Sequence, residues 1–302
     1  MKKLLTTLLA TTMILNVSGQ DKAPSKSRLV AKDAKPVLIS SDFAFTEGPA
    51  ADPDGNVFFT DQPSDRIMKW STDGALTVFM EGTGRSNGLF FDRKGNLISC
   101  ADLENQLWEI DANKNVKVLV RDFEGKKLNG PNDLWVDARG GIYFTDPFYK
   151  RDYWTRTDKE IEEERVYYLS PDKKTLSVAA DGFVRPNGIA GTRDGKTLYV
   201  ADINDRKTYA FRVNPDGTLS DRRVFTEMGS DGMTVDSKGN VYITGRGITV
   251  FNAMGEQIEH IAIDEPWTAN LCFGGRDLKT LFITASKSVY TLKMNVRGFR
   301  PR

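Results

Sequence analysis

Histidine is almost absent from this sequence, since His260 is the only one among 302 residues. This scarcity argues against a Ser-His-Asp or paired-histidine hydrolase and nearly excludes a zinc site built on imidazole ligands. Cysteine is also rare, with only Cys100 and Cys272 present. Each falls within a different apolar segment. We therefore expect two buried free thiols rather than a disulfide, although export of the protein would permit a bridge.

An excess of charge of one sign is missing as well. Lysine and arginine number 42 against 41 aspartates and glutamates, which leaves a formal net charge of +1. No block of like charge occurs, so nothing indicates binding to nucleic acid or to an anionic membrane surface. The hydrophobic fraction of 39% and the charged fraction of 27% are ordinary for a soluble globular protein.

A long apolar run occurs only at the beginning of the chain, over residues 4–17, where two lysines precede it. This pattern predicts a signal peptide over residues 1–19, and hence export, with a periplasm as the expected destination. A retained anchor is the alternative, but the run is short and Thr-rich for a membrane span. We expect residues 20–35 to form a loose polar leader and residues 36–302 to form one folded domain without membrane contact.

What the sequence does contain is a repeat. Each copy has a polar residue, a short apolar strand, a turn with glycine and a return strand, as in residues 131–146. The polar residues that open the six copies, called tips below, are Glu47, Asn87, Asn132, Asn187, Asp231 and Asn270. A repeat of roughly 40 to 55 residues with four short strands is typical of a β-propeller blade. We therefore predict an all-β fold, a six-bladed β-propeller.

The last copy ends after three strands, so it lacks the outer strand of a complete blade. The segment Pro36–Ile39 has the composition of a strand and precedes the first copy. We expect it to complete the last blade, because this closure joins the two ends of the ring and removes exposed sheet edges.

The register of the repeat places all six tips at one mouth of the central channel. Four of the return strands end in aspartates that we expect at the same face, further from the axis: Asp61, Asp102, Asp146 and Asp202. Carboxylate and amide oxygens around one axis are the ligands that a hard divalent cation prefers. Calcium tolerates irregular geometry best, with magnesium, manganese and zinc as alternatives. The plainer interpretation is that Asn-Gly and Asp-Gly pairs only form turns.

The longest spacing between copies lies between the third and fourth, over residues 147–164. This segment follows Asp146 and should therefore emerge on the tip face. It contains Tyr149 and Trp154 among several aromatic and basic residues, which suits a lid over the channel. A mobile surface loop ending in a short acidic helix is the alternative.

Several motifs resemble the gluconolactonase and senescence-marker-protein (regucalcin-like) family, most closely its bacterial gluconolactonase branch. They are Glu47-Gly48-Pro49, Pro131-Asn132-Asp133, Pro186-Asn187-Gly188, Ser230-Asp231-Gly232-Met233 and Phe273-Gly274-Gly275. The resemblance implies a six-bladed propeller with a divalent metal, commonly calcium, in the channel and hydrolysis of sugar lactones. It also implies metal ligands at Glu47, Asn187 and Asp231, together with Asn132, whose counterpart binds the metal or the substrate depending on the family member. Animal members carry an arginine where this chain has Gly130, so their sugar contacts do not transfer.

Together these lines predict a metal-dependent lactone hydrolase whose partner is a small sugar lactone. Asp231 is the expected catalytic carboxylate that orients or deprotonates the water, although a bound cation would weaken it as a base. Asp202 or Asp146 could take that role instead. The side chains expected to bind substrate are Asn87, Asn132, Asn270, Tyr149 and Trp154. Two alternatives remain: a calcium-dependent phosphotriesterase-like hydrolase and a non-catalytic ligand-binding propeller.

Overall fold

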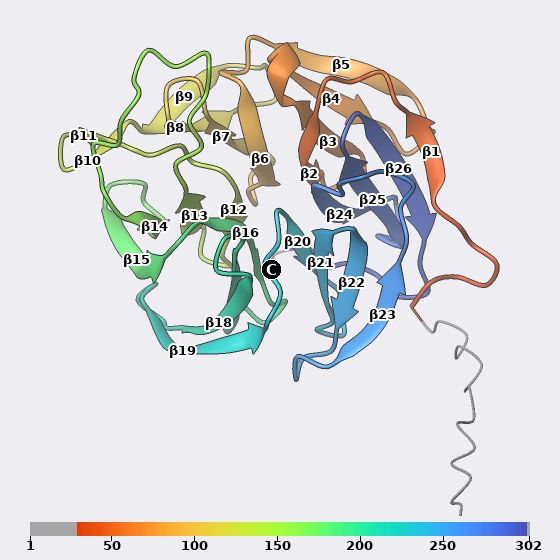
Figure 1. Ribbon diagram of the computed structural model, residues 1–302. Coiled ribbons are helices and arrows are strands. Elements are labelled where there is room, and N and C mark those ends of the chain that lie inside the picture. The colour runs from red at the N-terminus through yellow and green to blue at the C-terminus, as the bar shows by residue number, and fades with distance from the viewer. Residues whose placement is uncertain (1–28, 301–302) are drawn as a thin grey trace, which may run out of the picture.

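Six four-stranded antiparallel sheets surround a central axis in the computed structural model, which describes residues 29–300 (Figure 1). The predicted all-β, six-bladed propeller is therefore confirmed. In every blade the innermost strand opens with a tip or lies next to one, and the following strands pair outward in chain order.

The blades are formed by consecutive strands. Blade 1 comprises β2 (Thr46–Ala51), β3 (Val57–Asp61), β4 (Arg66–Trp70) and β5 (Leu76–Glu81). Blade 2 comprises β6 (Ser86–Phe91), β7 (Leu97–Ala101), β8 (Gln106–Ile110) and β9 (Val116–Val120). Blade 3 comprises β12 (Leu134–Val136), β13 (Ile142–Asp146), β14 (Glu164–Leu169) and β15 (Leu176–Phe183). Blade 4 comprises β16 (Pro186–Gly191), β17 (Thr197–Asp202), β18 (Lys207–Val213) and β19 (Leu219–Thr226). Blade 5 comprises β20 (Met233–Val235), β21 (Val241–Gly245), β22 (Gly247–Phe251) and β23 (Gln257–Ile261).

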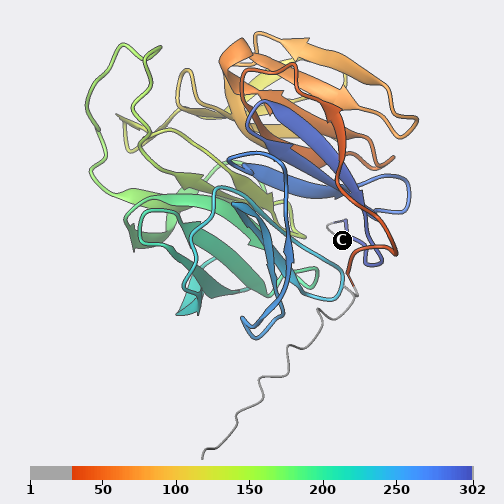
Figure 2. The same cartoon turned by 45° about the vertical axis from the view of Figure 1, so that its right-hand side comes forward.

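Blade 6 contains strands from both ends of the chain. The strands β24 (Asn270–Gly274), β25 (Thr280–Ala285) and β26 (Ser288–Lys293) follow one another, and β1 (Val37–Ser40) adds the outer strand (Figure 1 and Figure 2). The antiparallel pairing of β1 with β26 matches Val37 with Thr291. The predicted closure of the ring is thus confirmed, with the strand shifted by one residue from the expected Pro36–Ile39.

The residues just before β1 are also held against blade 6. Val30 forms an isolated bridge with Met294, and the buried Leu29 belongs to the apolar cluster between blades 5 and 6. The leader expected to be loose over residues 20–35 is therefore packed from Leu29 onward. The predicted signal peptide lies outside the described residues and stays a prediction.

The turns at the face opposite the tips repeat one arrangement. Asp52 Oδ1 accepts hydrogen bonds from the backbone N–H groups of Asp54 and Asn56, each at 2.9 Å. Asp92, Asp137 and Asp236 repeat this pattern in their blades. The carboxylate satisfies backbone donors that the tight turn leaves without partners, as expected for aspartate in a turn. These four turns therefore share one hydrogen-bonded structure at the face opposite the tips.

The remaining local structure is sparse. A short two-stranded hairpin, β10 (Asp122–Phe123) with β11 (Lys126–Lys127), and a single 3-10 turn, η1 (Gln62–Ser64), lie between blade strands. The acidic helix considered for residues 158–164 does not form, because this stretch makes bends and then enters β14. In residues 29–300 no helix is long and apolar enough to cross a bilayer.

The two cysteines and the histidine lie on strands of three different blades. Neither Cys100 in β7 nor Cys272 in β24 forms a disulfide; Cys100 is fully buried, and Cys272 is partly exposed. His260 lies in the outer strand β23, opposite Thr249 of β22, far from the inner strands that surround the axis. The expectation of free thiols agrees with these positions, but Cys272 is less buried than expected.

Candidate functional site

Four of the six tips are followed by glycine, and these glycines let neighbouring blades come into contact around the axis. A Cβ on Gly88 would lie 2.6 Å from the carbonyl oxygen of Asn132, and one on Gly188 would lie 2.8 Å from that of Asp231. Gly48 meets Asn87 in the same way, and Gly232 meets the side chain of Asn270. The Asn-Gly and Asp-Gly pairs are therefore close-approach positions rather than turns. Without these glycines the six tips could not converge.

Asn187 and Asp231 form the central contact of the site. Asn187 Nδ2 donates hydrogen bonds to Asp231 Oδ1 and to the hydroxyl oxygen of Tyr149, both at 2.8 Å. The indole N–H of Trp267 donates to Asp231 Oδ2 at 2.7 Å. Both carboxylate oxygens of Asp231 are thus held by side chains from neighbouring segments, which fixes the orientation of the carboxylate.

Glu47 and Asp133 bring two further carboxyl groups to the axis. Burial raises the pKa of Glu47 well above its ordinary value, and the charges of Asp231 and Asp133 raise it further. Burial likewise raises the pKa of Asp231, and raises that of Asp133 to about 7. In the described part of the chain, no lysine or arginine forms an ion pair with any of the three. Three buried carboxyl groups without a cationic partner favour binding of a positive ion.

The amide side chains of the tips provide unused oxygen atoms. Asn187 Oδ1 is buried and has no hydrogen-bond partner among the described residues. The side chains of Asn87 and Asn132 are almost fully enclosed yet make no hydrogen bond within residues 29–300. A buried, unpartnered amide oxygen beside a carboxylate costs free energy unless a ligand occupies the space that it faces.

This donor set fits the predicted cation. Glu47, Asn132, Asn187 and Asp231 offer two carboxylates and two amides, an oxygen set that suits calcium. Among residues 29–300 there is no group of three or more His, Cys, Asp or Glu side chains placed to hold a metal ion. A site at the tips therefore needs the amide oxygens as well as the two carboxylates.

Two of the aspartates that end the return strands, Asp202 and Asp146, bind backbone N–H groups instead of the tips. Asp202 accepts backbone N–H bonds from Val184, Arg185 and Asp205 at 2.7, 2.9 and 3.1 Å. Asp146 accepts two such bonds, from Asn129 and Gly130. Each carboxylate holds the loop that leads into the inner strand of its own blade. Asp202 and Asp146 thus bind the entry loops of their own blades, and the described hydrogen bonds do not bring Asp202 into the contacts around Asp231. A role for Asp202 or Asp146 as the base stays a prediction.

Asp102 occupies the same register but holds the 147–164 segment instead. Its Oδ2 accepts hydrogen bonds from Arg151 Nε at 2.9 Å and from the Tyr153 hydroxyl, and its carbonyl oxygen accepts one from the indole of Trp154. The Trp154 ring lies next to the position where a Cβ of Gly130 would project. Trp154, predicted to bind substrate, thus anchors the segment. Tyr149 is the residue of this segment that reaches the tips, through Asn187.

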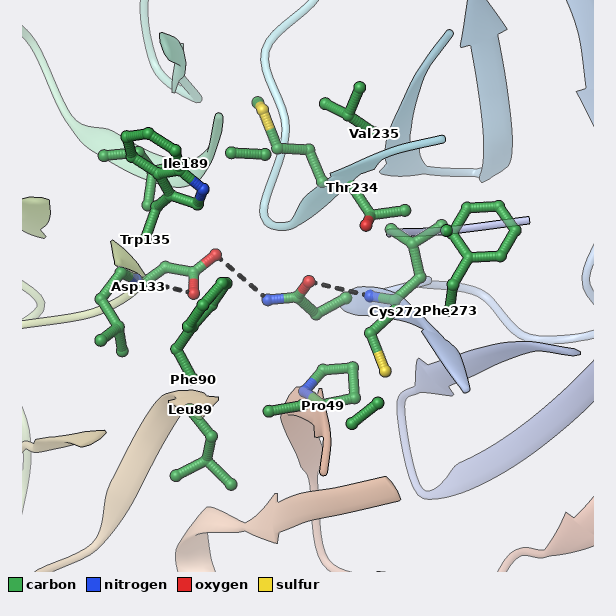
Figure 3. Close-up of a pocket in the computed structure, with 18 of the residues that line it drawn as sticks. Pro49, Leu89, Phe90, Asp133, Trp135, Ile189, Thr234, Val235, Cys272 and Phe273 are labelled. Carbon is green, nitrogen blue, oxygen red and sulfur yellow. Dashed lines mark hydrogen bonds between the residues drawn. The ribbon is translucent and has the colours of Figure 1, made fainter. Parts of the chain in front are cut away.

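A cavity of about 130 Å³ lies in the channel beneath the tips. Asn270 lines this cavity, and Figure 3 shows Asp133 among apolar lining side chains such as Phe90, Trp135 and Phe273. Asn270 Nδ2 donates to Asp133 Oδ2 at 3.3 Å. Gly298 and Phe299, near the C-terminus, line the cavity at the turn face. Asn270, predicted to bind substrate, therefore faces Asp133 and Glu47 at the lower edge of the site.

Two residues of the site were not predicted. Asp133 stands where four other copies have glycine after the tip, and this departure from the repeat could have identified it. Trp267 precedes the sixth tip by three residues and lies outside the repeated motif, so the sequence carried no signal for it.

Comparisons with known proteins agree with this architecture. The family model described as "SMP-30/Gluconolactonase/LRE-like region" matches residues 45–287. A gluconolactonase of Zymomonas mobilis is 29% identical over 86% of this chain and 82% of its own. A solved gluconolactonase of Xanthomonas campestris is 30% identical, covers 88% of this chain and 91% of its own, and has a TM-score of 0.82. Regucalcin from Agrobacterium tumefaciens, described as a calcium-binding protein, shares the fold at 17% identity with a TM-score of 0.76. This chain belongs to the SMP-30/gluconolactonase/LRE-like family.

Proposed function

We propose that this protein is a metal-dependent lactone hydrolase that opens sugar lactones in the channel mouth. The observation that carries the proposal is the hydrogen bond between the side chains of Asn187 and Asp231. A buried amide oxygen without a partner lies beside a carboxylate that is oriented from both sides. Its relatives from Zymomonas mobilis and Xanthomonas campestris are named for lactone hydrolysis, which places the chain among hydrolases of lactone esters.

The residues that would hold the ion are Glu47, Asn132, Asn187 and Asp231, with Ca²⁺ as the ion of choice. A hard cation bound there would polarise the lactone carbonyl and stabilise the negative charge that develops on its oxygen. The buried carboxyl groups support this proposal, because burial raises the pKa values of Glu47 and Asp231 and a bound cation would stabilise their charged forms.

Asp231 is the group best placed to handle the proton. Hydrolysis forms a bond between the water oxygen and the carbonyl carbon and breaks the ring C–O bond, and the water proton finally passes to the released ring oxygen. Trp267 and Asn187 hold the two oxygens of Asp231, so the carboxylate can orient the water and accept its proton in one fixed geometry. Asp202 and Asp146 are the alternatives, but their carboxylates hold the entry loops of their own blades instead of contacting Asn187 or Trp267.

The remaining tips would bind the sugar ring. The free amide groups of Asn87 and Asn132 offer donors and acceptors to ring hydroxyls, and Tyr149 provides a ring and a hydroxyl beside Asn187. This arrangement supports an enzyme more than a purely binding propeller, because polar groups remain free for a substrate next to the oriented carboxylate. We also propose that the protein is exported to a periplasm, on the strength of its first 19 residues.

The decisive experiment is a pH-stat assay of a small panel of aldonolactones. Protein stripped with a chelator is assayed before and after addition of calcium, magnesium, manganese or zinc. Turnover that requires a metal is the expected result. A folded protein that binds calcium but opens no lactone with any metal would overturn the proposal, and a parallel organophosphate panel would then test the phosphotriesterase alternative.

A further inference from the structure

Two arginines lie beside Tyr149 at the rim of the site. Arg151 belongs to the 147–164 segment, and Arg185 directly precedes β16. The guanidinium carbon of Arg185 is 4.9 Å from the centre of the Tyr149 ring, and that of Arg151 is 5.2 Å from it. The hydroxyl of the same tyrosine accepts the hydrogen bond from Asn187. Tyr149 therefore contacts both guanidinium groups with its ring and the tip residue Asn187 with its hydroxyl.

Arg151 is held by a hydrogen bond from its inner nitrogen, whereas the inner nitrogen of Arg185 has only a long ion-pair contact and no hydrogen-bond partner among residues 29–300. Arg151 Nε donates to Asp102 Oδ2 at 2.9 Å, and Arg185 Nε lies 3.6 Å from Glu164 Oε2. Within residues 29–300, the terminal nitrogens of both guanidinium groups have no hydrogen-bond acceptor. The side chains of Arg151 and Arg185 are 25% and 31% exposed, so a ligand can reach them.

Arg185 shares its carboxylate neighbour, Glu164, with a lysine. Glu164 already forms a 2.7 Å ion pair with Lys159, so it offers Arg185 only a longer and weaker contact. Arg85 adds another cation near the rim, over the ring of Tyr153 at 4.3 Å, and its side chain bonds only the carbonyl oxygen of Pro63. Arg85, Arg151 and Arg185 thus bring three cations to the rim, where Asp102 pairs with Arg151 and Glu164 is shared by Arg185 and Lys159.

Arg151 is held by Asp102, an aspartate that departs from the pattern of the other blades. In blades 1, 3 and 4 the aspartate at the end of the return strand holds its own entry loop, whereas in blade 2 Asp65 performs this task for Thr83 and Arg85. Asp102 is thereby freed to bind Arg151 and Tyr153. Asp102 thus differs from the other return-strand aspartates, because it holds Arg151 instead of its own entry loop. This difference favours a ligand-binding role for Arg151.

We propose that the preferred substrates are lactones that carry a second, anionic group, a carboxylate or a phosphate, which Arg151 and Arg185 bind while the lactone carbonyl lies at the tips. The planar guanidinium matches either oxyanion with two parallel hydrogen bonds, and such charge-assisted bonds are stronger than neutral ones. This inference rests on the proposed lactonase activity and specifies its substrate class.

The test compares glucono-δ-lactone, glucaro-δ-lactone and the phosphate ester of the first on its primary hydroxyl, in the calcium-loaded protein. The variants are Arg151→Met, Arg185→Met and, as a matched control at the far face, the exposed Arg93→Met. We expect kcat/KM for one anionic lactone to exceed that for the neutral one by at least about tenfold. In Arg151→Met and Arg185→Met this ratio should fall about tenfold, mainly through KM, and in Arg93→Met it should not change.

The anionic preference should also weaken with added salt, because it depends on partly exposed charges. Calorimetric titration with glucarate tests the anion site without turnover, and we expect binding that Arg185→Met weakens about tenfold. The carboxylate and phosphate arms identify which anion is preferred. Equal rates on all lactones, or equal losses on neutral and anionic lactones in both arginine variants, would overturn this inference but leave the lactonase intact. Absence of turnover on every lactone would instead overturn the proposed function, and lack of glucarate binding would then overturn the anion site too.

Discussion

The indole N–H of Trp267 lies 2.7 Å from Oδ2 of Asp231 and donates a hydrogen bond to it, although the two residues belong to different parts of the ring. Asp231 opens the fifth copy of the repeat, whereas Trp267 lies in the loop that leads to the sixth. Since Asn187 holds the other oxygen, the carboxylate has one accessible orientation. Trp267 is therefore a positioning residue for the proposed catalytic carboxylate.

Replacing Trp267 with phenylalanine keeps most of the ring but removes the N–H donor. A hydrogen bond to a charged group contributes about 1.5–3 kcal/mol, so we expect kcat to fall about 10- to 100-fold with a smaller change in KM. Steady-state kinetics on an aldonolactone measure this. Trp108→Phe is the matched control, because it removes an indole hydrogen bond to Gln106 in the outer part of blade 2. Equal losses in the two variants would contradict a positioning role.

Asp231→Asn keeps the size of the side chain and removes its charge. We expect kcat to fall by about 10²- to 10⁴-fold, the usual contribution of a positioned acid or base, while circular dichroism and Tm show an intact fold. Asp221→Asn, in a surface ion pair of β19 with Arg212, is the control and should behave as the wild type. Retained turnover in Asp231→Asn would remove this residue from the mechanism.

Asp133 makes the stability of the chelated protein depend on pH. Burial raises its pKa from 3.8 to about 7, so the folded protein keeps this proton when the unfolded chain has lost it. The stabilisation from this group is complete below about pH 4 and is lost as the pH rises toward 7. Urea unfolding with a chelator present should show a loss of stability between about pH 5 and 7, to which Glu47 and Asp231 also contribute. The part that comes from Asp133, about 3 kcal/mol, should be missing in Asp133→Asn.

Calcium should reverse this loss. An ion that binds only the folded state adds about 3 kcal/mol of stability when its concentration is 100 times its Kd. Thermal unfolding near neutral pH, with and without calcium, checks this expectation. The opposite result, in which calcium leaves Tm unchanged in the wild type, would argue against an ion at the tips.

Gly232→Ala should disturb the convergence of the tips. A Cβ at this position would clash with the side chain of Asn270, which contacts Asp133 in turn. Overpacking of this kind costs about 1–3 kcal/mol. We expect a lower Tm together with reduced activity. Gly245→Ala is a suitable control in the same blade, because its Cβ would meet only the flexible end of Met228 at 3.5 Å. Comparable effects in both variants would show that close approach at the tips is not the cause.

Asp102→Asn should release the 147–164 segment. The variant loses the ion pair with Arg151 and weakens the bond from Tyr153, so trypsin should cleave at Lys150 or Arg151 several times faster. Asp61→Asn provides the comparison, since Asp61 has the same register but binds Arg66 and the entry loop of blade 1. That variant should lower Tm without faster cleavage in the segment, and the reverse outcome would contradict the anchoring role of Asp102.

The sequence by itself determined the fold and the identity of the tips. Six copies of a strand–turn–strand pattern allow only a repeated sheet, and the missing strand of the last copy required Val37–Ser40 to complete the ring, one residue from the predicted segment. Because each tip has the same place in its copy, the convergence of residues such as Glu47, Asn187 and Asp231 followed from register alone. Family membership confirms the resemblance seen in these motifs.

Only the tertiary structure decided the tasks of the aspartates that end the return strands and of the residues outside the repeat. Nothing in the sequence distinguishes Asp202, which binds its own entry loop, from Asp102, which binds Arg151, because both end a return strand in the same register. Trp154 and Tyr149 lie in one irregular segment, and its path places one against Gly130 and the other against Asn187. Repeats fix positions through a periodic backbone, whereas contacts between an insertion and a distant blade depend on how the chain packs in three dimensions.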